Sequence, residues 1–203
     1  MFWLHYPLNG ENMNGEEALA KLLEGNRRFV AGTPEARDMA KRRAELVEGQ
    51  HPIATVVTCS DSRVVPEYIF DAGLGEIFKV ETAGNVLDKV GLGSVEYGVG
   101  HLHTPLLVVL GHEKCGAVTA AYDGHAEGNI AAIVRKLAPA IKRAKKGGDK
   151  AAEVEDAAAV NVRKVLGKLK MLPPVKAALD SGALKAVGMK YDLGGAVEVI
   201  VRK

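Results

Sequence analysis

Two kinds of hydrophobic spacing alternate along the chain. Apolar runs occupy residues 53–57 and 106–110, and such runs are typical of buried parallel strands. Residues 76–80, which include two charged positions, are predicted to form the strand between them. Other stretches have the spacing or the start signals of helices, the second of them mostly polar. These predicted helices span residues 15–30, 35–48, 66–70, 88–102, 115–122, 129–146 and 150–169, and a further one begins at Pro173-Pro174. The alternation of strands and helices predicts an α/β fold.

The C-terminal part of the chain has a different pattern. Residues 184–191 and 196–202 alternate between apolar and polar positions, and Asp192-Leu193-Gly194-Gly195 between them is a hairpin signal. We therefore expect a central, mainly parallel β-sheet of four to five strands, flanked by helices, with the last strand antiparallel. Residues 1–203 are expected to form a single domain, in which residues 1–48 are an N-terminal arm with helices and residues 49–203 are the α/β core.

The predicted helix at residues 88–102 contains four glycines. Each glycine weakens a helix by about 1 kcal/mol relative to alanine. Close packing against neighbouring elements is the expected reason for Gly91, Gly93, Gly98 and Gly100.

Composition excludes several classes of function. Of the 203 residues 47% are hydrophobic and 26% are charged, and the net charge of +2 gives no reason to expect a nucleic-acid partner. No apolar run reaches the ~18 residues of a membrane helix. The N-terminus lacks the features of a signal peptide, so a cytoplasmic location is the expectation. In a reducing compartment the two cysteines favour a metal or catalytic role over a disulfide.

Metal-ligating side chains follow two of the predicted strands. Cys59 comes directly after the first strand, and His112 and Cys115 come after the third. Ligands in open α/β sheets bind at the carboxyl ends of the strands. Two thiolates and one imidazole suit a catalytic zinc ion, which takes three protein ligands and keeps one position open. We predict one Zn²⁺ per chain, held by these three residues.

A possible acid–base pair lies next to the first cysteine. An extended segment would point Cys59, Asp61 and Arg63 to the same side. Arginine can grip a carboxylate with two hydrogen bonds and keep it ionised. Asp61 could then accept a proton from water at the zinc, or it could move onto the metal as a fourth ligand and close the site.

With these motifs in place, the sequence resembles the β-class carbonic anhydrases. The resemblance rests on Cys59-Ser60-Asp61-Ser62-Arg63 and, about fifty residues later, Gly111-His112-Glu113-Lys114-Cys115-Gly116. It extends over most of the chain, and further matches are 23–29, Gly75-Glu76-Ile77-Phe78, Ala83-Gly84-Asn85, Ser94-Val95-Glu96-Tyr97 and 188–192.

The resemblance implies roles for individual residues. Cys59, His112 and Cys115 match the zinc ligands of the family, and Asp61 and Arg63 match its aspartate–arginine pair, whose aspartate is in some members the fourth ligand. The positions that match its substrate pocket are Gln50, which would hydrogen-bond the substrate, Phe78, Tyr97 and Gly84.

Two positions depart from the members that bicarbonate regulates. Those proteins carry a tryptophan before the zinc cysteine and an arginine after the second strand, where this chain has Val56 and Glu81. The departure favours the open-site, plant-like type. Family members are dimers or larger homo-oligomers with the pocket near the interface, and the same is implied here.

The implied function is the reversible hydration of carbon dioxide to bicarbonate and a proton, catalysed by a zinc lyase. His101 and His103 are candidate proton shuttles because histidine titrates near neutral pH. Hydrolysis of carbonyl sulfide or carbon disulfide on the same scaffold stays open as an alternative, as does a non-catalytic zinc-stabilised binding module. A nucleotide-binding fold is disfavoured, because no glycine-rich phosphate loop follows the first strand.

Overall fold

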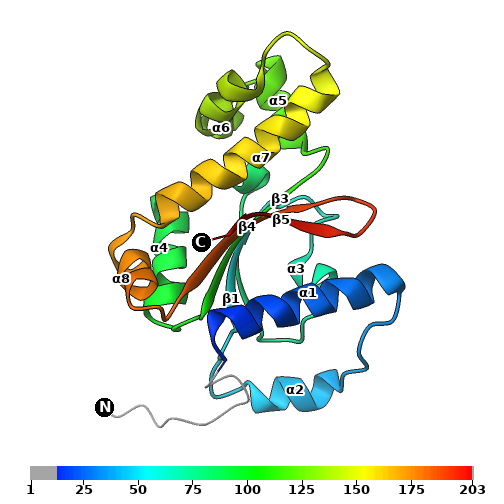
Figure 1. The fold of residues 1–203 in the computed structure, drawn as a ribbon, viewed down its shortest axis with the longest axis vertical. Coiled ribbons are helices and arrows are strands. Elements are labelled where there is room, and N and C mark those ends of the chain that lie inside the picture. Colours follow the sequence, from blue (N-terminus) through cyan, green and yellow to red (C-terminus); the bar gives the residue numbers. More distant parts are fainter. Residues whose placement is uncertain (1–12, 203) are drawn as a thin grey trace.

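The computed structural model describes residues 13–202, which form a five-stranded sheet with helices on both faces (Figure 1). The strand order is β2-β1-β3-β4-β5, with every neighbouring pair parallel except β4 and β5. The expected α/β class and antiparallel last strand are thus confirmed. The strands are β1 (Ala54–Thr58), β2 (Ile77–Glu81), β3 (Leu106–His112), β4 (Lys185–Tyr191) and β5 (Val197–Arg202).

The helices form three groups around this sheet. One face is covered by α1, the other by α4, α7 and α8, while α5 and α6 pack with α7 beyond the carboxyl ends of the strands (Figure 1). The helices are α1 (Gly15–Ala31), α2 (Met39–Glu45), α3 (Pro66–Ile69), the single turn η1 (Ala83–Asn85), α4 (Lys89–Gly100), α5 (Gly116–Asp123), α6 (Ile130–Ala144), α7 (Lys150–Leu169) and α8 (Pro173–Asp180).

The core is divided by the sheet. Successive side chains of a strand point to opposite faces, so Leu106 and Val108 of β3 pack toward α1 while Leu107 and Val109 pack toward α4 and α7. All of β1 and β3 is buried, as expected for central parallel strands. A third cluster of buried residues contains Cys59 and Cys115 together with residues of α5, α6 and α7.

Helix α1 is part of this core. It begins at a capping box, in which Asn14 and Glu17 satisfy each other's free backbone N–H groups. Its apolar stripe, Ala18, Leu19 and Leu22, is at most 2% exposed against the sheet. Residues 1–12 of the expected N-terminal arm lie outside the described residues, and the assignment of one domain stays a prediction.

Two predicted boundaries differ from the structure for identifiable reasons. Strand β3 runs on through Gly111 to His112, because these residues continue the parallel pairing with Lys190 and Tyr191 of β4. The predicted helix at residues 35–48 is only α2. The N–H of Glu35 and the guanidinium of Arg37 both bind Asp71, which holds this segment away from a helical path.

The glycines of α4 only partly follow the expectation of close packing. A Cβ on Gly98 would lie 2.3 Å from Thr55 Oγ1, and one on Gly91 would lie 2.8 Å from Leu87. Gly93, in contrast, faces open space. Among the described residues, no helix is both long and apolar enough to span a membrane.

Candidate metal centre

Cys59 lies one residue beyond the end of β1 and is 4% exposed. The backbone N–H of Gly84, in the turn that follows β2, donates a hydrogen bond to its sulfur at 3.2 Å. Because β1 pairs with both β2 and β3, this sulfur lies between the loops that follow the two neighbouring strands.

His112 and Cys115 come from the turn between β3 and α5. His112 is the last residue of β3, and Cys115 is the N-cap of α5. Lys114 between them has a φ of 51°, in the left-handed region that non-glycine residues rarely adopt. This reversal of the chain brings the imidazole and the second thiol to the same point.

The three ligand atoms converge as the sequence predicts. They all lie within 4.8 Å of one another, and the two sulfurs are 4.0 Å apart. Tetrahedral zinc with Zn–S bonds of about 2.3 Å requires sulfurs about 3.8 Å apart. The spacing therefore fits zinc.

The imidazole of His112 is oriented for a metal. Its Nδ1 lies 2.8 Å from the carbonyl oxygen of Glu113, which can only accept, so Nδ1 carries the proton. Nε2 is then left with a free lone pair, and it is buried without a hydrogen-bond partner among the described residues. An orphaned buried acceptor beside two thiols is the arrangement a zinc ion would complete.

The thiols influence each other's ionisation. A hydrogen bond from Cys115 lowers the pKa of Cys59, whereas the same contact and burial raise the pKa of Cys115. Burial alone would lower the pKa of His112, but the negative charge of the nearby Cys59 thiolate helps to raise it overall. Cys59 is therefore the sulfur that ionises first.

Asp61 and Arg63 form a bidentate ion pair next to the metal ligands. The arginine Nε and Nη2 donate to the two carboxylate oxygens at 2.9 and 2.7 Å, and the backbone N–H of Arg63 adds a third bond at 3.0 Å. These bonds hold the pKa of Asp61 well below its usual range. Its Oδ2 is 4.0 Å from Nε2 of His112.

The pair forms by a different route from the one expected from the sequence. Residues 61–64 are a turn closed by a bond from Val64 N–H to the Asp61 carbonyl, and they are not extended. Alternation along a strand was thus the wrong reason for the proximity of Asp61 and Arg63. A short polar side chain bonding its own backbone two residues on is the actual cause.

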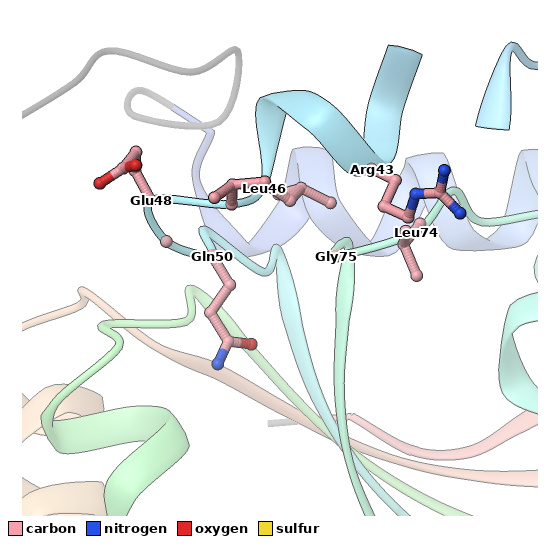
Figure 2. A pocket seen from close by; sticks show the side chains of 8 residues that line it. Arg43, Leu46, Glu48, Gln50, Leu74 and Gly75 are labelled. Carbon is pink, nitrogen blue, oxygen red and sulfur yellow. The ribbon is translucent and has the colours of Figure 1, made fainter. Parts of the chain in front are cut away.

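Most residues assigned to the substrate pocket lie far from the metal ligands of the same chain. Gln50 precedes β1 and lines a pocket of about 550 Å³ with Leu46 and Leu74 (Figure 2). The ring of Phe78 packs 5.9 Å from that of Tyr97, and Phe78 lies opposite Thr55 in the sheet. At about 3.3 Å per residue along a strand, Thr55 is roughly 13 Å from Cys59.

Gly84 differs from Gln50, Phe78 and Tyr97, because its backbone N–H contacts the sulfur of Cys59. The candidate shuttle His101 stacks on Tyr97 at 4.7 Å, and His103 lies in the turn before β3. Within one chain both histidines therefore belong to the amino end of the sheet. The substrate-binding roles of Gln50, Phe78, Tyr97 and Gly84 stay predictions.

Helix α7 contributes contacts that the sequence reading missed. Glu155 accepts the N–H of Lys114 at 2.7 Å, and Asn161 donates to the carbonyl of Gly84 at 3.0 Å. Each bond restrains a loop that carries or contacts a metal ligand. A polar residue on the buried stripe of an amphipathic helix was the available signal for Asn161.

Known proteins are similar to this chain in sequence. A family model described as carbonic anhydrase matches residues 54–197. A carbonic anhydrase from Mycolicibacterium smegmatis is 41% identical over 196 residues, covering 93% of this chain and 94% of the relative. Carbonic anhydrase 2 from Mycobacterium tuberculosis is 40% identical over 189 residues, covering 90% of both chains.

Solved structures extend the similarity to three dimensions. A Coccomyxa β-carbonic anhydrase in complex with acetazolamide has a TM-score of 0.73 at 27% identity, covering 91% of this chain and 86% of that one. A tetrameric β-carbonic anhydrase from Sordaria macrospora has the same fold, with a TM-score of 0.74 at 23% identity, covering 90% and 96% of the two chains.

Proposed function

The chain belongs to the β class of the carbonic anhydrase family, and on that basis we propose how its residues carry out the zinc-dependent, reversible hydration of carbon dioxide to bicarbonate and a proton. The observation that carries the proposal is the convergence of Cys59, His112 and Cys115 beside an ion-paired Asp61. Bound zinc supplies Lewis acidity that makes water a nucleophile near neutral pH, an effect for which carbonic anhydrases with three-histidine sites are the standard example.

Asp61 acts as an oriented hydrogen-bond acceptor at the metal. Arg63 occupies both of its oxygens, which fixes the direction of the carboxylate. A carboxyl group whose pKa is held low stays ionised and retains a proton poorly. Asp61 therefore aligns the attacking water, and the released proton passes on to buffer.

The bidentate grip also keeps the site open. An aspartate held by two hydrogen bonds to Arg63 must break both to become a fourth metal ligand. The absence of tryptophan at Val56 and of arginine at Glu81 is consistent with this type of site. X-ray absorption at neutral pH should then find a zinc ion with two sulfurs, one imidazole and a fourth ligand from solvent.

The substrate pocket is completed by a second copy of the chain. Gln50, Phe78 and Tyr97 lie toward the amino ends of the strands, away from the metal of their own chain. Tyr97 is 47% exposed, which is unusual for a residue that is to line an apolar pocket. An isologous dimer would place these residues at the metal site of the partner.

Mixing two defective variants tests this shared pocket. Gln50→Ala impairs the pocket, and Cys59→Ser removes a metal ligand. Mixed dimers contain one site free of both changes, so random association should restore about a quarter of wild-type activity. Activity no higher than the mean of the two parents, with subunit exchange verified by mass spectrometry, would place the whole pocket in one chain.

A stopped-flow assay with a pH indicator tests the activity itself. Zinc-loaded protein should hydrate carbon dioxide, and chelator-treated protein should not. Absence of hydration with one zinc per chain would reject the proposal, and turnover of carbonyl sulfide or carbon disulfide instead would favour the alternative hydrolase. A cytoplasmic location, where both thiols stay reduced, is part of the proposal and is tested by cell fractionation.

A further inference from the structure

Asn161 is a buried polar residue of α7 with apolar neighbours on the same face of the helix. It is 1% exposed, and the residues around it on the helix, Ala157, Ala158, Val162 and Val165, are all buried and apolar. Burying a carboxamide is costly unless it is hydrogen-bonded. A residue with this cost must be explained by what it contacts.

The carboxamide contacts the loop that touches the metal site. Its Nδ2 donates to the carbonyl oxygen of Gly84 at 3.0 Å, and the N–H of Gly84 donates to the sulfur of Cys59 at 3.2 Å. A carbonyl oxygen can only accept, so the orientation of the carboxamide is determined. One residue thus links helix α7 to a metal ligand.

The conformation of Gly84 explains why the loop needs such a restraint. Its φ is +69°, and a Cβ there would lie 3.1 Å from both Ala117 and Leu137. The next residue, Asn85, also has a positive φ, of 43°. Two consecutive residues in the left-handed region are held by their surroundings, and Asn161 supplies the side-chain bond that fixes the Gly84 carbonyl.

We propose that Asn161 is a positioning residue for the metal centre: it fixes Gly84 so that the Gly84 N–H points at the Cys59 sulfur. The inference rests on the zinc site described above and deepens it. An N–H donor to a metal-bound thiolate withdraws charge from the sulfur and fixes its direction. Removal of such outer contacts typically costs 10–100-fold in metal affinity or activity.

The test compares Asn161→Leu with Val165→Ala. Leucine has nearly the same size but cannot donate, so the Gly84 carbonyl loses its partner. Val165 is a buried residue of the same helix that makes no hydrogen bond to the loop, so its truncation destabilises the fold without touching Gly84. Melting temperature, zinc release to a chromogenic chelator, and the thiolate charge-transfer band of cobalt-loaded protein are measured for both.

The expected result is specific to Asn161. Its leucine variant should bind zinc about tenfold more weakly, and its cobalt charge-transfer band should move to lower energy. Val165→Ala should lower the melting temperature and leave both metal measurements unchanged. If the leucine variant does not fold, Asn161→Ala gives the same readouts with a smaller packing change.

Two outcomes would overturn the inference. Unchanged zinc release and an unshifted band in the Asn161 variants would show that the Gly84 contact does not depend on this side chain. Equal metal effects in Val165→Ala would mean that Asn161 acts only through stability. Both readouts are independent of carbon dioxide turnover, so they decide the role of Asn161 even if the proposed activity fails.

Discussion

The two ends of the sheet differ in how completely one chain builds them. At the carboxyl end, Cys59, His112 and Cys115 are at most 4% exposed and converge within 4.8 Å. At the amino end, Gln50 is exposed and Tyr97 is 47% exposed. One folded chain therefore brings the three metal ligands together by itself, whereas under the proposed function the exposed residues at the amino end form the substrate pocket only in a dimer. Changes at the two ends should have different consequences.

The largest effect is expected from Cys59→Ser. Loss of one of three ligands should release zinc. The activation barrier should then rise by several kcal/mol, which corresponds to a rate lower by roughly 10³-fold or more. Zinc content by mass spectrometry and stopped-flow hydration measure this, while the oligomer mass should not change. Ser60→Ala, at the exposed neighbouring position, serves as the control. A zinc-loaded, active serine variant would remove Cys59 from the ligand set.

Arg63→Ala should have the next largest effect. The carboxylate of Asp61 then loses both side-chain hydrogen bonds, its pKa rises toward the ordinary value, and it can rotate onto the metal. We expect a fall in kcat of about 100-fold, the scale of a positioned polar group in catalysis. Arg63→Lys should be intermediate because an ammonium group cannot make the bidentate contact. Wild-type kcat in the alanine variant would separate the ion pair from catalysis.

Tyr97→Ala tests the amino end alone. Loss of the ring that packs on Phe78 and His101 should lower kcat/KM by about tenfold, since an aromatic contact of roughly 1.4 kcal/mol corresponds to one order of magnitude. Zinc content should stay at one per chain. Met171→Ala, also an exposed apolar position, should change neither quantity. Loss of zinc in the Tyr97 variant would mean that the two ends are not independent.

The smallest effect on catalysis is expected from Asp71→Asn, which acts on stability. Burial raises the pKa of Asp71, but hydrogen bonds from Arg37 and Arg28 outweigh this effect and lower the pKa to about 2. Because the pKa in the folded state lies below the ordinary value of about 3.9, the stabilisation of about 2 kcal/mol is complete above pH 4 and is lost as the pH falls toward 2.

Urea unfolding at pH 7 and pH 3 checks this sign. Asp71→Asn should be less stable than wild type at pH 7, and the gap should narrow at pH 3. Glu67→Gln, which breaks the exposed pair with Lys79, should cost less than about 1 kcal/mol at either pH. A gap for Asp71→Asn that does not change with pH would show that packing, and not charge, is lost.

The sheet and the metal ligands could be predicted because local pattern and chemistry agree there. The sequence pattern predicted strands β1, β2 and β3 to within two residues, and the cysteines that follow β1 and β3 are the only two in the chain. Boundaries failed where distant contacts decide them. Gly111 stays in β3 because it pairs with Lys190 of β4, and no local pattern contains that information.

The supporting contacts of the site were not predictable in the same way. Asn161 is about a hundred residues from Cys59 in sequence, and its function depends on where α7 crosses the loop at Gly84. The ion pair between Arg63 and Asp61 was expected, but the expected cause was alternation along a strand. In the structure a turn brings the two residues together. A contact between residues that are close in sequence can be predicted correctly for the wrong reason. A contact between distant residues can be predicted only when the fold is known.

The hydrogen bonds of Asn26 have a consequence for the order of events during synthesis. This residue of α1 bonds the carbonyls of Ile69 and Gly195 and the N–H of Val197, so its side chain ties the first helix to the last hairpin. At ribosomal rates of about 5–20 residues per second, roughly 10–30 s separate the emergence of Asn26 from that of Val197. Throughout that interval the apolar stripe of α1 has no complete sheet to cover. Helix α1 is thus synthesised early, but its side-chain bonds to the hairpin can form only after β4 and β5 have been made.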